Sequence, residues 1–309
     1  MEFRRALVTG GAGFIGSHLA ERLLLEGMQV VVLDDLSVGK RENVPPDVVF
    51  VEGDVCDPDT VVAAVSGVDV VFHLAARVSI RASVAGFYRD AQTNLMGTLN
   101  VPHACAAENV KKLVCASSMA VYADSPKPVP LPETYRTEPI SPYGVAKLAS
   151  ERYAMLVADQ AGFQALALRY FNTYGPRQTF TPYVGVMTIF IRRLLRGEPP
   201  IIFGDGEQCR DFVYVGDIVE ATFQAMLSTV HGEVISVGSG TSTSVNRVAA
   251  LLCARLRPDV APRYAPEHAG ELRNSIADIR KAQQLLGYDP RGRIEDKMDE
   301  IIEWNREMM

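Results

Sequence analysis

The chain has 309 residues, 48% of them hydrophobic, which is typical of a globular protein with a full core. Its net charge of −6, without any block of lysine and arginine, argues against nucleic acid as a partner. It contains no apolar run long enough to cross a bilayer and no signal-peptide core before the first strand, so we expect a cytoplasmic protein without a membrane partner.

The cysteines and histidines are few and dispersed. Five of each are present, and no two cysteines have C-x-x-C spacing. We therefore expect neither a disulfide framework nor a metal site.

Residues 6–35 predict a buried strand, a glycine turn, an amphipathic helix and a second buried strand. Gly11, Gly13 and Gly16 have G-x-G-x-x-G spacing, and Gly10 with the last two also fits G-x-x-G-x-x-G. Such glycines let the backbone approach a pyrophosphate, which would bind at the N-terminus of the helix that Phe14 and Ile15 begin. The alternative is a tight turn that binds nothing.

The second strand ends in Asp34, where a carboxylate accepts hydrogen bonds from ribose hydroxyls and repels a 2′-phosphate. The sequence therefore predicts NAD rather than NADP as the cofactor. The alternative for Asp34 is a solvated strand end. The predicted cofactor site also includes the residues that follow it, which are Asp35, Leu36, Ser37 and Gly39.

Two further apolar strands, over 48–55 and 68–76, end in polar or small residues. Asp54 and Val55 are placed to flank the adenine, although Asp54 could equally cap the helix after Pro58. Leu74, Ala75 and Ala76 would let the backbone lie close to the cofactor. We interpret His73 as a hydrogen-bonded core residue.

A helical segment, 88–109, carries Asn94, which we place near the active site or, alternatively, as an ordinary polar helix residue. The next strand, 112–116, delivers Ser117 and Ser118 at its carboxyl end. The alternation of strands and helices predicts an α/β protein with a Rossmann-type, doubly wound parallel sheet.

After a proline-rich loop, Ser141 and Pro142 predict a helix start, and Tyr143 and Lys147 follow on one helix face. A phenol with a pKa of about 10 becomes a base when an ammonium and an oxidised nicotinamide lower that pKa. Tyr143 would then remove a hydroxyl proton, while Ser118 holds the oxygen and Lys147 contacts the nicotinamide ribose. The alternative is an exposed tyrosine on a helix.

We divide the chain into a dinucleotide-binding domain, 1–174, and a smaller substrate-binding lobe, 175–309. Apolar segments within 211–237 are expected to return to the first domain. Arginines in loops of the lobe could grip a diphosphate or remain solvated; these are Arg177, Arg210 and Arg273.

Together, these motifs resemble the extended short-chain dehydrogenase/reductases, specifically the NAD-dependent nucleotide-sugar epimerase/dehydratase group, over essentially the whole chain. The segments that carry the resemblance are 9–16, 54–55, 73–76, 117–118, 143–147, 169–177, 210–215 and 275–278. The resemblance implies that Tyr170 and Phe171 contribute to the NAD site. It implies a substrate site made of Ser118, Tyr143, Asn172, Arg210, Arg273 and Ser275.

Within this family, dehydratases carry an acidic pair just after the strand-end serines, and decarboxylases usually keep a glutamate. This chain has Met119 and Ala120, so the resemblance implies 4-epimerisation of a UDP-hexose through a 4-keto intermediate. The predicted substrates are UDP-glucose and UDP-galactose. Ser275 would leave room for the N-acetylhexosamine pair.

Three alternatives are a uronate 4-epimerase, a 4-keto reductase and a non-catalytic NAD-sensing protein. The presence of both Tyr143 and Lys147 disfavours the last. The family usually forms homodimers through the helices around Asn94 and Tyr143. Leu148, Tyr153 and Leu156 are compatible with such packing and equally with an intramolecular core.

Overall fold

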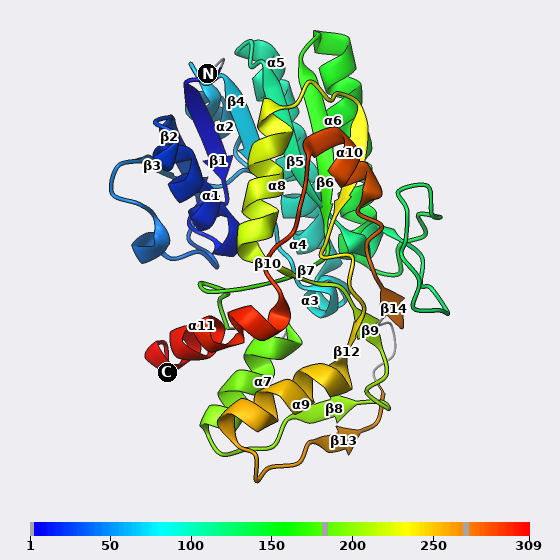
Figure 1. Cartoon of the computed structure of the whole chain (residues 1–309). Helices are drawn as coiled ribbons and strands as arrows, with labels where there is room; N and C mark the ends of the chain where they lie inside the picture. The colour runs from blue at the N-terminus through cyan, green and yellow to red at the C-terminus, as the bar shows by residue number, and fades with distance from the viewer. Residues whose placement is uncertain (1–2, 181–184, 268–271) are drawn as a thin grey trace.

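The computed structural model describes residues 3–180, 185–267 and 272–309 (Figure 1). Its centre is a seven-stranded parallel sheet in the order β11-β6-β5-β4-β1-β2-β3. The strands are β1 (Arg5–Thr9), β2 (Gln29–Asp34), β3 (Val49–Glu52), β4 (Val70–His73), β5 (Lys112–Ser118), β6 (Gln164–Tyr170) and β11 (Glu233–Val237). The strand order changes direction between β1 and β4, which confirms the predicted doubly wound fold.

The register brings the carboxyl ends of the central strands to one edge. Thr9 of β1 pairs with both Leu33 of β2 and His73 of β4, and Ser118 of β5 pairs with Tyr170 of β6. Ligands of open parallel sheets bind outside this edge, where the strand order reverses. The residues predicted for the cofactor and for catalysis therefore lie around one edge.

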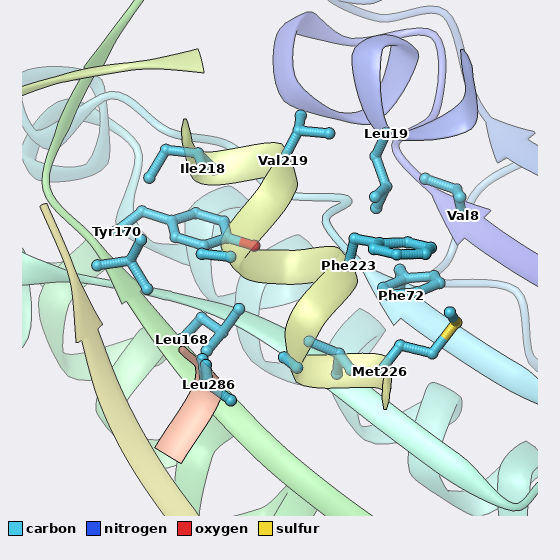
Figure 2. Close-up of a cluster of buried hydrophobic side chains, with 14 of the residues drawn as sticks. Val8, Leu19, Phe72, Leu168, Tyr170, Ile218, Val219, Phe223, Met226 and Leu286 are labelled. Carbon is cyan, nitrogen blue, oxygen red and sulfur yellow. The ribbon is translucent and has the colours of Figure 1, made fainter. Parts of the chain in front are cut away.

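Helices cover both faces of the sheet (Figure 1). One face carries α1 (Phe14–Leu25), α8 (Val215–Leu227) and α10 (Arg280–Leu286), and the other carries α2 (Pro58–Val65), α5 (Thr98–Ala107) and α6 (Pro142–Ala161). Figure 2 shows how α8 reaches the core: Ile218, Val219, Phe223 and Met226 form one apolar stripe that faces Leu19 and the sheet. Burial of such stripes on both faces holds the sheet rigid.

A second, smaller part of the chain lies beyond the carboxyl edge of the sheet and includes the C-terminal helix (Figure 1). Its core is formed by α7 (Val186–Leu195), α9 (Val245–Leu256) and α11 (Ile294–Glu307), beside the pair β8 (Ile201–Phe203) and β13 (Arg263–Ala265). The segments α8, β11 and α10 lie instead on the sheet, so the chain crosses between the two parts several times. The boundary at residue 175 stays a prediction.

Short elements lie between the larger ones, within the sheet domain and between the two parts. The strands are the parallel pair β7 (Asn172–Tyr174) and β10 (Phe212–Tyr214), and β9 (Cys209–Arg210) between β12 (Thr243–Ser244) and β14 (Asn274–Ser275). The helical turns are η1 (Arg41–Asn43), α3 (Ile80–Ala85), α4 (Phe87–Ala91), the π-helix η2 (Gln92–Gly97) and η3 (Met119–Val121). These connections carry many of the predicted site residues.

Within the residues that the structure describes, no helix is both long enough and apolar enough to cross a membrane.

Candidate functional site

The glycine turn between β1 and α1 has the close packing that its sequence predicts. Gly10 has a φ of +70°, and a Cβ there would lie 2.7 Å from the Ala75 nitrogen. A Cβ at Gly16 would collide with the Gly10 carbonyl group. Gly13 is the N-cap of α1 and supplies no capping side chain, so the first helical residues, Phe14 and Ile15, offer their N–H groups at the sheet edge.

Asp34 lies at the end of β2 and is 7% exposed. Its Oδ2 accepts a hydrogen bond from the Ala12 amide at 2.9 Å, and its Oδ1 accepts one from the Leu36 amide at 2.9 Å. Burial raises the pKa of Asp34, whereas these two hydrogen bonds lower it, and the effect of burial is the larger. Each oxygen keeps a second lone pair, so the carboxylate can still accept hydroxyl groups from a ribose.

The loop after Asp34 is held close to the glycine turn. Leu36 has a φ of +57°, and Asp35 accepts hydrogen bonds from the amide and hydroxyl groups of Ser37. A Cβ at Gly39 would lie 2.8 Å from the Ala12 carbonyl carbon. The loop therefore borders the same edge as the turn.

Asp54 does not cap the helix that follows it. Its Oδ1 accepts from the Cys56 amide at 2.9 Å in a local turn, whereas Asp57 is the N-cap of α2 and accepts from the Asp59 amide. The capping alternative is therefore wrong, and Asp54 keeps its position at the sheet edge. Val55 is buried against Gly97, where a Cβ would lie 2.9 Å from its Cγ2.

The exit of β4 is fixed by a buried chain of hydrogen bonds through His73. Its Nδ1 is 2.8 Å from Thr9 Oγ1 and its Nε2 is 2.9 Å from Thr98 Oγ1. Thr9 Oγ1 also accepts from the Ala75 amide, at 3.2 Å, which holds the segment of Leu74, Ala75 and Ala76 beside β1. Burial lowers the pKa of His73 to about 3, so it is a neutral core residue, as interpreted from the sequence.

The structure brings Ser118, Tyr143 and Lys147 together at the end of β5. Tyr143 and Lys147 are 7% and 3% exposed, and the Lys147 ammonium donates to the Ala116 carbonyl at 2.9 Å. The Ser118 hydroxyl lies near enough to the Tyr143 phenol to lower its pKa. Three predicted catalytic side chains thus share one buried corner.

The helix α6 starts as predicted, because the Ser141 hydroxyl accepts from the Gly144 amide at 3.1 Å and Pro142 occupies the first turn. Gly144 has a second role, since any Cβ there would collide with the Ala120 carbonyl group. The missing side chain lets α6 lie directly against the turn after β5 and so sets the position of Tyr143.

The pKa of Tyr143 in the protein alone is raised. Burial raises it to about 12, the nearby Ser118 hydroxyl lowers it, and the Asp90 carboxylate raises it. Burial also lowers the pKa of Lys147 to about 8. In the protein alone, desolvation of the phenolate outweighs the local polar contacts, and the lowering expected in the presence of an oxidised nicotinamide stays a prediction.

Asn94 lies in the π-helix η2, which interrupts the single helix predicted for 88–109. Its side chain is completely buried and bonds both backbone groups of Arg77, with Oδ1 accepting at 2.8 Å and Nδ2 donating at 2.9 Å. Its carbonyl group accepts from the hydroxyls of Thr98 and Ser150. Asn94 therefore ties the loop after β4 to α5 and α6.

Three other predicted cofactor residues point their polar or aromatic groups into the core. The Ser117 hydroxyl donates to Glu151 at 2.5 Å, and the Tyr170 hydroxyl lies 2.7 Å from Thr222 Oγ1 on α8. Phe171 is 4% exposed and packs beside Tyr122. These side chains support the sheet edge, so only their backbone groups remain for a cofactor contact.

The predicted substrate residues come together where the two parts of the chain meet. Ser275 of β14 pairs with Arg210 of β9, and Asn172 donates to the Ser275 hydroxyl at 3.3 Å. Arg210 donates to the carbonyl groups of Cys209 and Arg273. The short β9–β14 pairing thus assembles a polar corner beyond β6.

Arg273 belongs to this corner, but its guanidinium forms a two-pronged ion pair with Asp205, at 2.9 and 2.8 Å. The pairing lowers the pKa of Asp205 to about 2. Arg177 donates to Glu21 on α1 at 2.6 Å and is therefore held against that helix rather than in this corner.

Sequence reasoning missed several residues that position the site. Ser83 accepts from the Tyr143 amide at 3.3 Å, and Glu151 forms a buried ion pair with Arg169 at 2.8 Å. Glu151 lies one helix turn after Lys147 on the same helix face, so its spacing in the sequence could have identified it. No local signal identified Asp205, because its partner is 68 residues away.

A surface cavity of about 420 Å³ opens at the other end of the sheet, before β5 and β6, beside Lys111, Phe163 and Ser228. It contains none of the predicted site residues. Because parallel sheets bind ligands at the carboxyl ends of their strands, we assign the functional site to the opposite edge. The described residues contain no group of three or more potential ligands arranged around a metal ion.

Comparisons with known proteins agree with this geometry. The model of the NAD dependent epimerase/dehydratase family matches residues 6–238. A protein of Methanocaldococcus jannaschii described as a putative UDP-glucose 4-epimerase is 36% identical, covering 96% of this chain and 97% of its own length.

Two solved structures superpose over almost the full chain. The UDP-glucose 4-epimerase of Thermotoga maritima, with UDP-glucose, has a TM-score of 0.94 and 40% identity, covering 98% of this chain and 99% of its own. The UDP-N-acetylglucosamine 4-epimerase of Methanobrevibacter ruminantium M1, in complex with UDP-N-acetylmuramic acid, has a TM-score of 0.94 and 36% identity, covering 100% of both chains. This chain belongs to the NAD-dependent epimerase/dehydratase family.

Proposed function

We propose that this chain catalyses the NAD-dependent 4-epimerisation of a UDP-hexose, with UDP-glucose and UDP-galactose as substrates and the N-acetylhexosamine pair as further ones. The observation that carries the proposal is the corner of Ser118, Tyr143 and Lys147 at the same edge of the sheet as the glycine turn. The similarity to the Thermotoga and Methanobrevibacter enzymes supports it.

The glycine turn fits a dinucleotide, because the backbone at Gly10 and Gly16 leaves no space for a Cβ and the start of α1 is uncapped by a side chain. The Asp34 carboxylate fits the ribose of NAD and disfavours a 2′-phosphate. When bound, NAD supplies hydride transfer at the fourth carbon of the sugar. We place it between this turn and the Tyr143 corner.

The residues of the chain then handle the proton. Tyr143 removes the proton of the 4-hydroxyl during oxidation and returns it after the 4-keto sugar has presented its other face. Ser118 holds the sugar oxygen, and the Lys147 ammonium stabilises the phenolate. No net redox change results.

The turn after β5 limits the chemistry to one carbon. Met119 and Ala120 occupy η3, next to Ser118, and neither side chain can donate or accept a proton. Dehydration needs an acid and a base at neighbouring carbons, so this turn favours epimerisation alone.

We place the nucleotide diphosphate against Arg210 and Arg273, and the sugar near Asn172 and Ser275. Arg273 must leave Asp205 before it can bind a phosphate, because its guanidinium is engaged by both carboxylate oxygens. The small Ser275 side chain supports a site that accepts an N-acetyl group at the second carbon.

We further propose a cytoplasmic homodimer. The exposed apolar side chains Tyr88, Val145, Tyr153 and Leu156 lie on α4 and α6, at 81%, 55%, 45% and 51% exposure, whereas Leu148 is half-buried against the core. A second copy packed on these helices would cover them. The five cysteines are all free, which fits a reducing compartment.

The test incubates purified protein, without added cofactor, with UDP-glucose, UDP-N-acetylglucosamine or UDP-glucuronate, and follows the anomeric and fourth-carbon protons by NMR. Appearance of the galacto epimer supports a 4-epimerase with resident NAD, and Tyr143→Phe is the matched inactive control. If the two hexose substrates stay unchanged after NAD is added, the proposal fails, and turnover of UDP-glucuronate would favour a uronate 4-epimerase.

A further inference from the structure

Asp90 is a buried carboxylate beside the catalytic corner that the proposed mechanism leaves without a role. It lies on α4, is 2% exposed and accepts a hydrogen bond from Asn94 Nδ2 at 2.9 Å through its Oδ1. Its Oδ2 is buried without a hydrogen-bond partner. A buried carboxylate with one unpaired oxygen is costly unless nearby positive charge compensates it.

Burial raises the pKa of Asp90, whereas its hydrogen bond with Asn94 and the charges of Arg77 and Lys147 lower it, so these two cations are the compensating charges. The contact between their elements is direct: α4 and η2 pack on α6, and Ser150, one turn after Lys147, donates to the Asn94 carbonyl at 2.8 Å. Asp90 is thus buried where α4 and η2 pack against α6, the helix that carries Lys147.

Every other ionisable group that acts on Lys147 is neutral or already paired. Burial raises the pKa of Cys115 on β5 to about 12, and burial lowers that of His73 on β4 to about 3, so both are uncharged near neutral pH. Glu151 on α6 is paired with Arg169 through both oxygens. Tyr143, on the same helix, is a neutral phenol. Asp90 also feels the charge of Arg77, but its Oδ2 has no hydrogen-bond partner, so among these groups Asp90 is the carboxylate that is not held in a direct ion pair.

We propose that Asp90 is a positioning residue that keeps the buried Lys147 ammonium protonated and fixes the orientation of Asn94. A carboxylate can only accept hydrogen bonds, so Asp90 forces Nδ2 of Asn94 toward itself and leaves Oδ1 for the Arg77 amide. Through Asn94 it also anchors the loop after β4. The inference rests on the proposed function in so far as Lys147 must be charged for turnover.

The main test is the variant Asp90→Asn, which keeps the shape and can still accept from Asn94 but removes the charge. We expect the alkaline limb of its kcat–pH profile with UDP-glucose to move to lower pH by about one unit, because Lys147 loses its proton earlier. Asp90→Glu keeps the charge, so the alkaline limb of its kcat–pH profile should lie at the same pH as that of the unsubstituted protein. The matched control is Asp299→Asn, which removes a carboxylate that is 82% exposed on α11 and should leave the profile unchanged.

A second measurement needs neither cofactor nor substrate. The unfolding free energy of each protein is compared with that of its Lys147→Met counterpart across pH, and the pH at which the difference begins to change reports the loss of the Lys147 proton. This onset should also fall by about one pH unit in Asp90→Asn. Asp90→Ser supplies the same comparison if the Asn variant does not fold.

The proposed role of Asp90 is overturned if Asp90→Asn changes neither the onset pH of the unfolding free-energy difference nor the alkaline limb of the kcat–pH profile. A lowered onset in a protein whose unmodified form turns over none of the offered nucleotide sugars would support that role and refute the proposed function instead. The two inferences therefore fail separately.

Discussion

The substitution Lys147→Met should stabilise the protein without cofactor while removing its proposed catalytic charge. Burial lowers the pKa of Lys147 from 10.5 to about 8, so the folded state holds the proton less tightly than the unfolded chain by about 2.5 pH units. At about 1.4 kcal/mol per unit, the buried ammonium costs about 3 kcal/mol below pH 8. Lys147→Met also loses the hydrogen bond to the Ala116 carbonyl, and this loss offsets about 1 kcal/mol of the gain in stability.

We therefore expect Lys147→Met to be more stable at pH 7 by about 2 kcal/mol. Between pH 8 and 10.5 the unfolded lysine keeps its proton while the folded one has lost it, so rising pH stabilises the unsubstituted chain. The difference in unfolding free energy in favour of Lys147→Met should therefore decrease through this pH range and change sign at its upper end. Urea unfolding from pH 6.5 to 10.5 measures the difference. A variant that is less stable at pH 7, with a gap that does not depend on pH, would refute the reasoning.

Three further substitutions test separate parts of the site. Tyr143→Phe should fold and retain NAD but lose about 10²–10⁴-fold in turnover, measured by NMR with UDP-glucose, because the proton acceptor is gone; near-normal turnover would contradict the mechanism. Glu151→Gln should lower the unfolding free energy by about 3 kcal/mol, measured by urea unfolding, because it leaves the Arg169 charge buried and unpaired; a change below 1 kcal/mol would count against a tight pair. Ser275→Tyr should reduce kcat/KM for UDP-N-acetylglucosamine about tenfold more than for UDP-glucose, because its larger side chain would project beside Asn172 into the proposed sugar site. Equal losses for both substrates would remove Ser275 from the specificity site.

Much of the fold and of the sheet-edge chemistry could be predicted because the signals are local. A parallel sheet requires apolar strands, a glycine turn needs residues without a Cβ, and the ends of the strands then meet at one edge. Gly10, Asp34, Ser118 and Tyr143 each follow directly from a strand end or a helix start. The parallel register of the sheet brings the strand ends that carry them to one edge, without any long-range pairing in the lobe.

The direction in which side chains point could not be predicted from such signals. Ser117 and Tyr170 occupy strand ends as expected, but alternation along a strand turns their hydroxyls toward Glu151 and Thr222. The ion pair between Arg273 and Asp205 joins two loops of the lobe and leaves no mark in either segment. Likewise, the π-turn at Asn94 breaks a sequence that reads as continuous helix.

The raised pKa of Tyr143 has a consequence for how the proposed reaction is controlled. In the protein alone this phenol is a weaker acid than free tyrosine, since burial and Asp90 both oppose the phenolate. The groups of the chain therefore do not by themselves make Tyr143 a base at neutral pH. Its activation needs additional positive charge in the same buried corner, which the oxidised form of the proposed cofactor carries. A proton acceptor that is silent without its cofactor suits an enzyme whose oxidation and proton removal must occur together.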